Sequence, residues 1–97
     1  MSMTSLPFTV QPGTRSGGAI NITVRIDCDA KTKATDILHY LRSIGMKQDL
    51  QSGWCQDNYP GYGMAVHGGP RPVFKDPKDR GSGVLAYEQD FRLTKPI

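Results

Sequence analysis

The sequence has no apolar run that approaches the roughly 20 residues a helix needs to cross a membrane. Its opening stretch, MSMTSLPF, has neither a basic segment nor an apolar segment, so we expect no secretory signal. Cysteine is scarce, because Cys28 and Cys55 are the only two. One possible bridge does not make a disulfide-held scaffold, and without a signal we expect reduced thiols and a cytoplasmic location.

What remains fits one globular domain. The 97 residues are 37% hydrophobic and 22% charged, which is typical of a folded chain and allows a single core over residues 1–97. The 11 glycines and 7 prolines predict long or numerous loops, and we expect residues 1–5 to be flexible. The net charge of +3 permits a negatively charged partner but does not require one.

The clearest element is AINITVRIDC, residues 19–28, in which apolar and polar residues alternate strictly. That period of two predicts a half-buried strand. LPFTVQ, residues 6–11, alternates in the same way and predicts a second strand, limited to an edge by Pro7. PGTRSGG, residues 12–18, has the glycines and proline of a turn, so the two strands form a hairpin with a basic tip.

Residues 29–45 predict one amphipathic helix that ends at Gly45, because their apolar residues recur at helical spacing. Residues 46–52 fit a short strand or an irregular return. Residues 64–75 predict a strand broken by a bulge or bend at residues 68–70. The charged stretch 76–83 predicts a loop.

Residues 83–94 predict a final strand, whose apolar face includes Leu85, Tyr87, Phe91 and Leu93 together with Gln89. The order is strand, strand, helix, broken strand, strand. A helix and an antiparallel sheet of about four strands, each apolar on one side, predict a two-layer α+β fold. The layout is similar to a β-grasp, an analogy that carries no function. A final strand at a sheet edge could also pair with its copy in a homodimer.

The stretch GWCQDNYPGYG, residues 53–63, predicts an irregular aromatic and glycine-rich loop. Its Trp54 fits a plug at the end of the core. Tyr59 and Tyr62 fit either a partner surface or a lid on the core, and their exposure decides between the two. Tyrosine, tryptophan and arginine are enriched at interface hot spots, which favours a binding role for this loop.

Metal, phosphate and catalytic sites have weaker signals. The candidate zinc ligands Cys28, His39, Cys55 and His67 follow one another at intervals of 11, 16 and 12 positions, unlike the close pairs of structural zinc sites. A phosphate loop would need a strand before its glycines and a helix after them, and this chain lacks that context.

Two kinds of enzyme also have candidate residues. A thiol enzyme would need Cys55, His67 and Asp57 to converge, and their spacing does not show that they do. A small basic ribonuclease would draw on a set with no diagnostic order: Tyr62, His67, Arg71, Lys75 and Arg80.

The sequence therefore favours a small non-enzymatic binding protein, without cofactor or metal, that docks on a protein or a protein–nucleic-acid complex. An accessory or inhibitor protein of a phage or mobile element, such as one that blocks a host defence complex, is one form of this hypothesis. The predicted docking residues are Trp54, Tyr59, Tyr62, His67, Arg71 and Lys75. The alternatives are a nucleic-acid-binding module, with bases stacked on the aromatics and Arg15, Arg71 and Lys75 on phosphates, or the ribonuclease.

Overall fold

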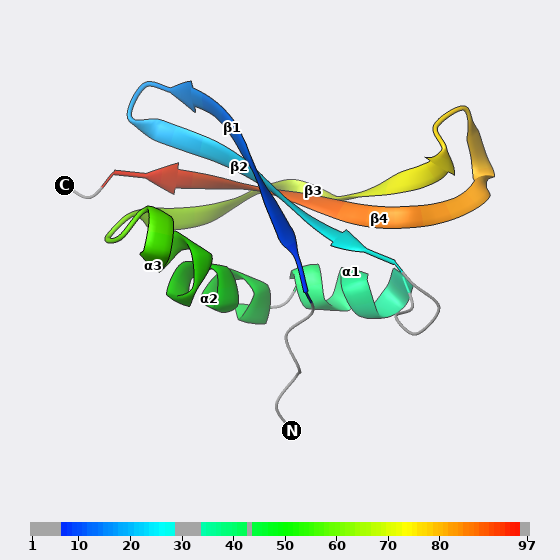
Figure 1. Cartoon of the computed structure of the whole chain (residues 1–97), viewed down its shortest axis with the longest axis horizontal. Coiled ribbons are helices and arrows are strands. Elements are labelled where there is room, and N and C mark those ends of the chain that lie inside the picture. The colour runs from blue at the N-terminus through cyan, green and yellow to red at the C-terminus, as the bar shows by residue number, and fades with distance from the viewer. Residues whose placement is uncertain (1–6, 29–33, 43, 96–97) are drawn as a thin grey trace.

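The computed structural model describes residues 7–28, 34–42 and 44–95 (Figure 1). Two strands, β1 (Thr9–Ser16) and β2 (Ala19–Asp27), come first. Three helices follow: α1 (Ala34–Arg42), α2 (Ile44–Ser52) and α3 (Trp54–Asn58). The chain closes with two long strands, β3 (Gly63–Asp76) and β4 (Asp79–Thr94).

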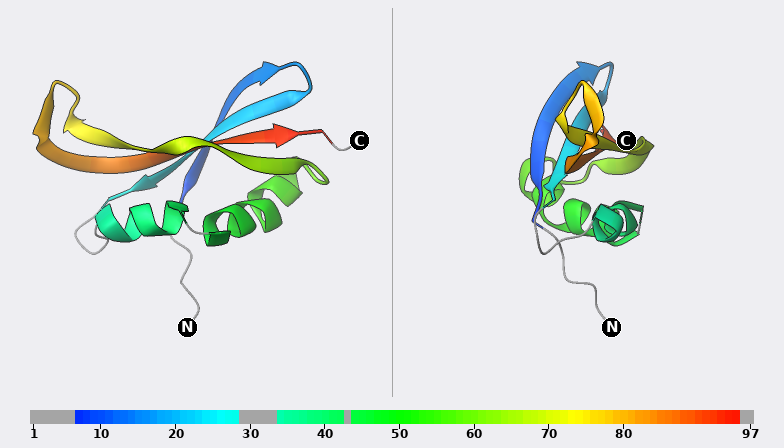
Figure 2. Two further views of the ribbon diagram at one scale, coloured as in Figure 1. Left: turned by 180° about the vertical axis from the view of Figure 1, so that it is seen from behind. Right: turned by 90° about the vertical axis from the view of Figure 1, so that its right-hand side faces the viewer.

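The four strands form one antiparallel sheet in the order β1-β2-β4-β3. The helices lie against one of its faces, so the predicted two-layer α+β fold is confirmed (Figure 2). β4 pairs with β2 on one side and with β3 on the other. The final strand is therefore central, and β1 and β3 are the edges. The premise that residues 83–94 form an edge strand is wrong, so a homodimer would not form through that strand.

The core lies between the helices and the inner face of the sheet. Alternate residues of β2 enter it, as the period of two predicts: Ile20, Ile22, Val24 and Ile26 are buried. Facing them from the helices are Ile37, Tyr40, Leu41, Met46 and Leu50. The Tyr40 hydroxyl donates to the Asp49 carboxylate and so ties α1 to α2.

The helical layer extends further than the sequence indicates. The predicted single helix ending at Gly45 is wrong, because Gly45 lies inside a second helix, α2. Residues 46–52 belong to this helix and form neither a strand nor an irregular return. Met46 and Leu50 are spaced one helical turn apart and both are buried, which explains the helix. Part of the expected 53–63 loop is also helical, because α3 buries Cys55 against Met64, with 4.0 Å between their sulfur atoms.

The first hairpin turns at Gly17–Gly18, with Gly17 in the left-handed region at φ 62°. β1 continues well past the predicted 6–11 stretch, whose Leu6 lies outside the described residues, as do residues 1–5. Its register shifts between Pro12 and Arg15. Gly13 lies there because a Cβ at this position would be 2.3 Å from the backbone oxygen of Asn21, closer than any side chain allows.

The second hairpin reaches past the N-terminal end of α1 as a long arm (Figure 1). The predicted loop at 76–83 is wrong, because β3 runs to Asp76, only residues 77–78 turn, and β4 begins at Asp79. Side chains on the outer part of the arm are exposed on both faces, so this part of the sequence lacks the alternation that marks a half-buried strand. Leu85, predicted to share the apolar face, is 40% exposed, near the register shift between Val73 and Phe74.

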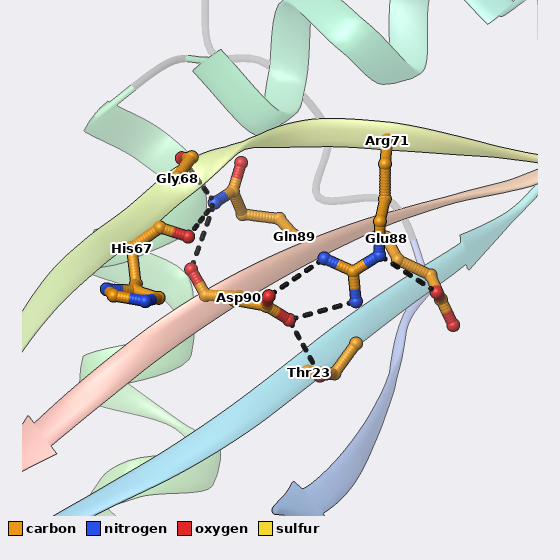
Figure 3. A network of polar contacts seen from close by, with 7 residues as sticks. All are labelled: Thr23, His67, Gly68, Arg71, Glu88, Gln89 and Asp90. Atoms are coloured by element: carbon orange, nitrogen blue, oxygen red, sulfur yellow. Dashed lines mark hydrogen bonds and ion pairs between the residues drawn. The ribbon is translucent and has the colours of Figure 1, made fainter.

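The predicted break in β3 is confirmed. His67 pairs with Asp90 and Arg71 with Glu88, so residues 68–70 of β3 lie opposite Gln89 alone. The Gln89 side chain is 1% exposed. Its Nε2 donates to the backbone oxygens of Gly68 at 3.0 Å, His67 at 3.4 Å and Asp90 at 2.9 Å (Figure 3). Without this amide, the backbone carbonyl groups at the break would lack hydrogen-bond donors. The hydrogen bonds from Gln89 therefore hold the break in one conformation.

Replacing Gln89 with leucine removes this donor while keeping the side chain about as large. We expect the free energy of unfolding to fall by about 1–3 kcal/mol, because the carbonyls of the break lose a buried hydrogen-bond partner. Urea denaturation measures the change. Gln11→Leu on the exposed edge strand β1 is the matched control and should change stability little. Equal or greater stability of Gln89→Leu would contradict the role assigned to the amide.

Candidate functional site

The six predicted docking residues do not form one surface. Trp54, Tyr59 and Tyr62 lie around α3 and the start of β3. His67 and Arg71 pair with Asp90 and Glu88, whose side chains lie on the outer face of the sheet, away from the helices. Lys75 lies near the far end of the hairpin arm. The structure thus places the six residues in three separate regions.

The three aromatic side chains form one contiguous cluster with tilted and edge-on ring contacts, which we call the aromatic stack. The ring centroids of Trp54 and Tyr59 are 5.6 Å apart, and those of Tyr59 and Tyr62 are 5.3 Å apart with an edge-on geometry. All three are partly buried and pack against the core. The tyrosines therefore serve in part as a lid, and alanine at Tyr59 or Tyr62 would loosen the core as well as remove a contact surface.

Arg71 is committed to a polar network on the outer face of the sheet (Figure 3). Its guanidinium donates two hydrogen bonds to the carboxylate of Asp90, at 2.8 and 3.0 Å, and its Nε lies 3.5 Å from a carboxylate oxygen of Glu88. The hydroxyl of Thr23, on β2, also donates to Asp90 at 2.7 Å. This network links β2, β3 and β4, and the carboxylates of Asp90 and Glu88 compensate the charge of Arg71 within the chain.

The network shifts the ionisation of both partners. The hydrogen bonds from Arg71 lower the pKa of Asp90 below its ordinary value of 3.8, with help from Thr23 and from the charges of Arg71 and His67. The same hydrogen bonds raise the pKa of Arg71 further. Both effects favour the ion pair. Arg71 therefore links neighbouring strands of the sheet, and its charge is neutralised by Asp90 within the chain.

A second group of cations has a different environment. Arg15, Arg92 and Lys95 are exposed and line two adjoining depressions, of about 80 and 520 Å³, at the end of the sheet where β1 turns into β2. Gly17 and Gly18 line both depressions, and Tyr62 lines the smaller one. We call the group of Arg15, Gly17, Gly18, Tyr62, Arg92 and Lys95 the cationic end. Figure 1 shows the β1–β2 turn, the end of β4 and the chain leading from α3 to β3 at the same end of the molecule.

Among the described residues, the cations of the cationic end have no acidic partner. The ion pairs within residues 7–28, 34–42 and 44–95 join Arg25 to Asp27 and Arg71 to Glu88 and Asp90, and none involves Arg15, Arg92 or Lys95. Arg15 and Lys95 line the depression that also includes Tyr62 of the aromatic stack, whereas Arg92 and Lys95 line the other one.

The candidate catalytic and metal sets are not assembled. Cys55 faces the core, where burial raises the pKa of its thiol, whereas His67 lies near Asp90 on the outer face of the sheet. The ribonuclease set is divided between the two ends of the sheet, with Tyr62 at one end and Lys75 and Arg80 on the arm. The described part of the chain contains no cluster of three or more His, Cys, Asp or Glu residues that could hold a metal ion.

Sequence reasoning missed Arg92 and Lys95 as site residues. Their only signal is that they are cations beside the last apolar residues of the final strand. Their position at the end of the sheet near the β1–β2 turn depends on the pairing of Ala19 with Thr94, which no local pattern reveals.

Comparison with known proteins gives no match: no family model, no characterised sequence relative and no solved structure matches the chain. Within the described residues, no helix is long and apolar enough to cross a membrane. A functional proposal must therefore be based on the chemistry of the chain itself.

The Arg71–Asp90 pair predicts a specific acid response. Because the folded state lowers the pKa of Asp90, the pair contributes stability at neutral pH that is lost as pH falls below about 4 and through the folded-state pKa. We expect Asp90→Asn to destabilise the protein at pH 7 by about 1 kcal/mol, a modest value because Arg71 is partly exposed. The difference from the unmodified chain should shrink in acid.

Urea denaturation at a series of pH values measures this response. Asp57→Asn is the matched control, because Asp57 is exposed on α3 and takes part in no ion pair within the described residues. A stability difference for Asp90→Asn that does not change between pH 7 and strongly acidic solution would contradict the assignment.

Proposed function

We propose that this chain is a non-enzymatic binding protein that docks on a negatively charged macromolecular partner through its cationic end. The observation that carries the proposal is the contrast between two sets of cations. Arg25 and Arg71 are paired within the sheet, whereas Arg15, Arg92 and Lys95 lie at one end of it and form no ion pair with any residue that the structure describes. Grouped like charges repel one another, and a polyanion relieves that repulsion.

Phosphate is the anion that these residues fit best. Arginine and lysine side chains bind phosphate oxygens through charge-assisted hydrogen bonds. The turn at Gly17–Gly18 has no Cβ atoms, so a phosphate can approach its backbone closely. Tyr62, beside Arg15 and Lys95, offers an aromatic edge to a neighbouring base. We therefore expect the nucleic-acid part of a nucleoprotein complex, or a single strand, to bind here, ahead of an acidic protein surface.

The stack formed by Trp54, Tyr59 and Tyr62 supports the cationic end from the helical side. Its packing against the core fixes Tyr62, so little rotamer entropy is lost when a partner binds. His67 and Lys75 stay predicted contact residues. They lie away from the cationic end, and a partner would have to extend along the outer face of the sheet to reach them. The inhibitor role and the phage or mobile-element origin stay predictions from the sequence.

The test is binding of a short, mixed-sequence single-stranded RNA, followed by fluorescence anisotropy over a series of salt concentrations. We expect the double variant Arg92→Glu and Lys95→Glu to bind at least about tenfold more weakly, because two phosphate contacts become repulsive. For three contacts, the logarithm of the affinity should fall with the logarithm of salt concentration with a slope of about −2.

The matched control is Lys78→Glu with Arg80→Glu, which makes the same charge change at the exposed tip of the arm. Equal weakening by the two double variants would mean that net charge, not the cationic end, determines binding. No binding to RNA at low salt, together with binding to polyglutamate, would replace nucleic acid by an acidic protein as partner. Binding to neither polyanion would overturn the proposal.

A further inference from the structure

A groove separates the helices from the break in β3, on the opposite face of the sheet from the Arg71 network. It has a volume of about 360 Å³ and is formed chiefly by Leu41, Arg42, Lys47, Val66, Gly69 and Gln89. We call it the β3 groove. None of its lining residues lines the cationic end, so the two surfaces are separate.

The floor of the groove is unusually apolar for an exposed surface. Val66 pairs with the buried Phe91 and so faces the helices, yet 52% of it is exposed. Val66 and Leu85 are the large hydrophobic residues that stand exposed within the described part of the chain. Beside Val66 lies Leu41, which belongs to the core. An apolar side chain placed here would bury surface that the fold leaves in contact with water.

The rim of the groove is basic. Arg42 is exposed and Lys47 partly exposed, and neither takes part in an ion pair with the described residues. No aromatic residue is among the described residues that line the groove, so they offer no surface on which a nucleic-acid base could stack. Apolar floor and cationic rim together match a peptide that carries carboxylates next to an apolar side chain.

The backbone beside the groove is suited to an extended ligand. β3 is an edge strand, so part of its N–H and C=O groups point away from β4 and can pair with another strand. Pro70 and Pro72 lack N–H groups, which limits such pairing to the stretch before the break, residues 63–67. At Gly69 a Cβ would meet nothing within 4 Å, so the missing side chain leaves the groove open.

We propose that the β3 groove binds an extended acidic segment of a partner protein alongside residues 63–67, with an apolar side chain over Val66 and carboxylates at Arg42 and Lys47. This contact goes beyond the proposed function, because it is a second binding site for a different chemistry. A protein that uses both sites would hold the nucleic-acid part of a complex at one end of its sheet and a protein component in the groove.

The test uses the full chain and two synthetic peptides of the same length, Glu-Val-Asp-Leu-Glu-Val and Lys-Val-Lys-Leu-Lys-Val, each with blocked ends. Amide chemical shifts recorded during the titration locate the binding site. We expect the acidic peptide to shift Val66, Gly69 and the side-chain amide of Gln89 at peptide concentrations up to about 1 mM, a range suited to a short unoptimised ligand. The basic peptide should leave these signals unchanged.

Two variants and their controls separate the groove from general effects. Gly69→Leu fills the groove and should weaken binding at least about tenfold by exclusion. Gln11→Leu adds an apolar side chain on the exposed edge strand β1, at a residue that lines neither the groove nor the cationic end, and should not weaken binding. Arg42→Glu with Lys47→Glu should abolish binding of the acidic peptide, whereas Lys78→Glu with Arg80→Glu should retain most of it.

Several results would overturn the proposal. One is the absence of shifts with the acidic peptide, and another is equal binding of both peptides. Shifts confined to the cationic end would assign the peptide to the polyanion site instead. Shifts at Val66 and Gly69 that depend on protein concentration without any peptide would identify a second copy of the chain as the occupant.

Discussion

The side-chain amide of Gln89 holds together the part of the sheet on which the β3 groove and the Arg71 network depend. It lies opposite three residues of β3 and donates to the backbone oxygens of two neighbouring β3 residues, His67 and Gly68. Because the break is fixed there, Val66 and Gly69 border a groove on the helical face. The backbone register places His67 opposite Asp90 before the break and Arg71 opposite Glu88 after it. On the outer face, Arg71 can therefore form ion pairs with both Glu88 and Asp90. One buried polar group thus specifies both faces of the hairpin.

The charges of the chain serve two purposes. Those in the middle of the sheet are paired and contribute to its cohesion, because Arg71 binds two carboxylates and Thr23 supports one of them. Those at the cationic end and at the rim of the β3 groove have no such partners among the described residues. Cations kept apart from acidic residues weaken the folded state slightly through repulsion, a cost that binding of an anion removes. This division of the charges supports the proposal that the protein acts by docking on an anionic partner.

Local patterns predicted β2, the first part of the helical layer and the inner part of the last two strands, whereas pairing between distant segments determined the site. The strict alternation over residues 19–28 depends only on burial of one face, so β2 and its core residues followed from the sequence. Gln89 was likewise placed on the apolar face. Its partners were not predictable, because they are backbone carbonyls of β3, which any residue type provides.

The helices and the cationic end show the same limit. Among the α2 residues whose burial the structure describes, Met46 and Leu50 are the buried apolar ones, too few for a clear period. Arg15 and Lys95 are 80 positions apart in the sequence and lie together through the pairing of β1 with β2 and of β2 with β4. The charged arm carries no apolar face over its outer part, so its strands resembled a loop.

The most direct measurement of the central claim, that the cationic end is the surface that docks, is a residue-by-residue map of amide chemical shifts during titration with single-stranded RNA. The account predicts that the largest changes occur at Gly17, Gly18 and Lys95, that Tyr62 follows, and that the tip of the arm at Lys78 and Gly81 is unchanged. Changes that are largest at the tip, or that spread evenly over every exposed cation, would contradict it.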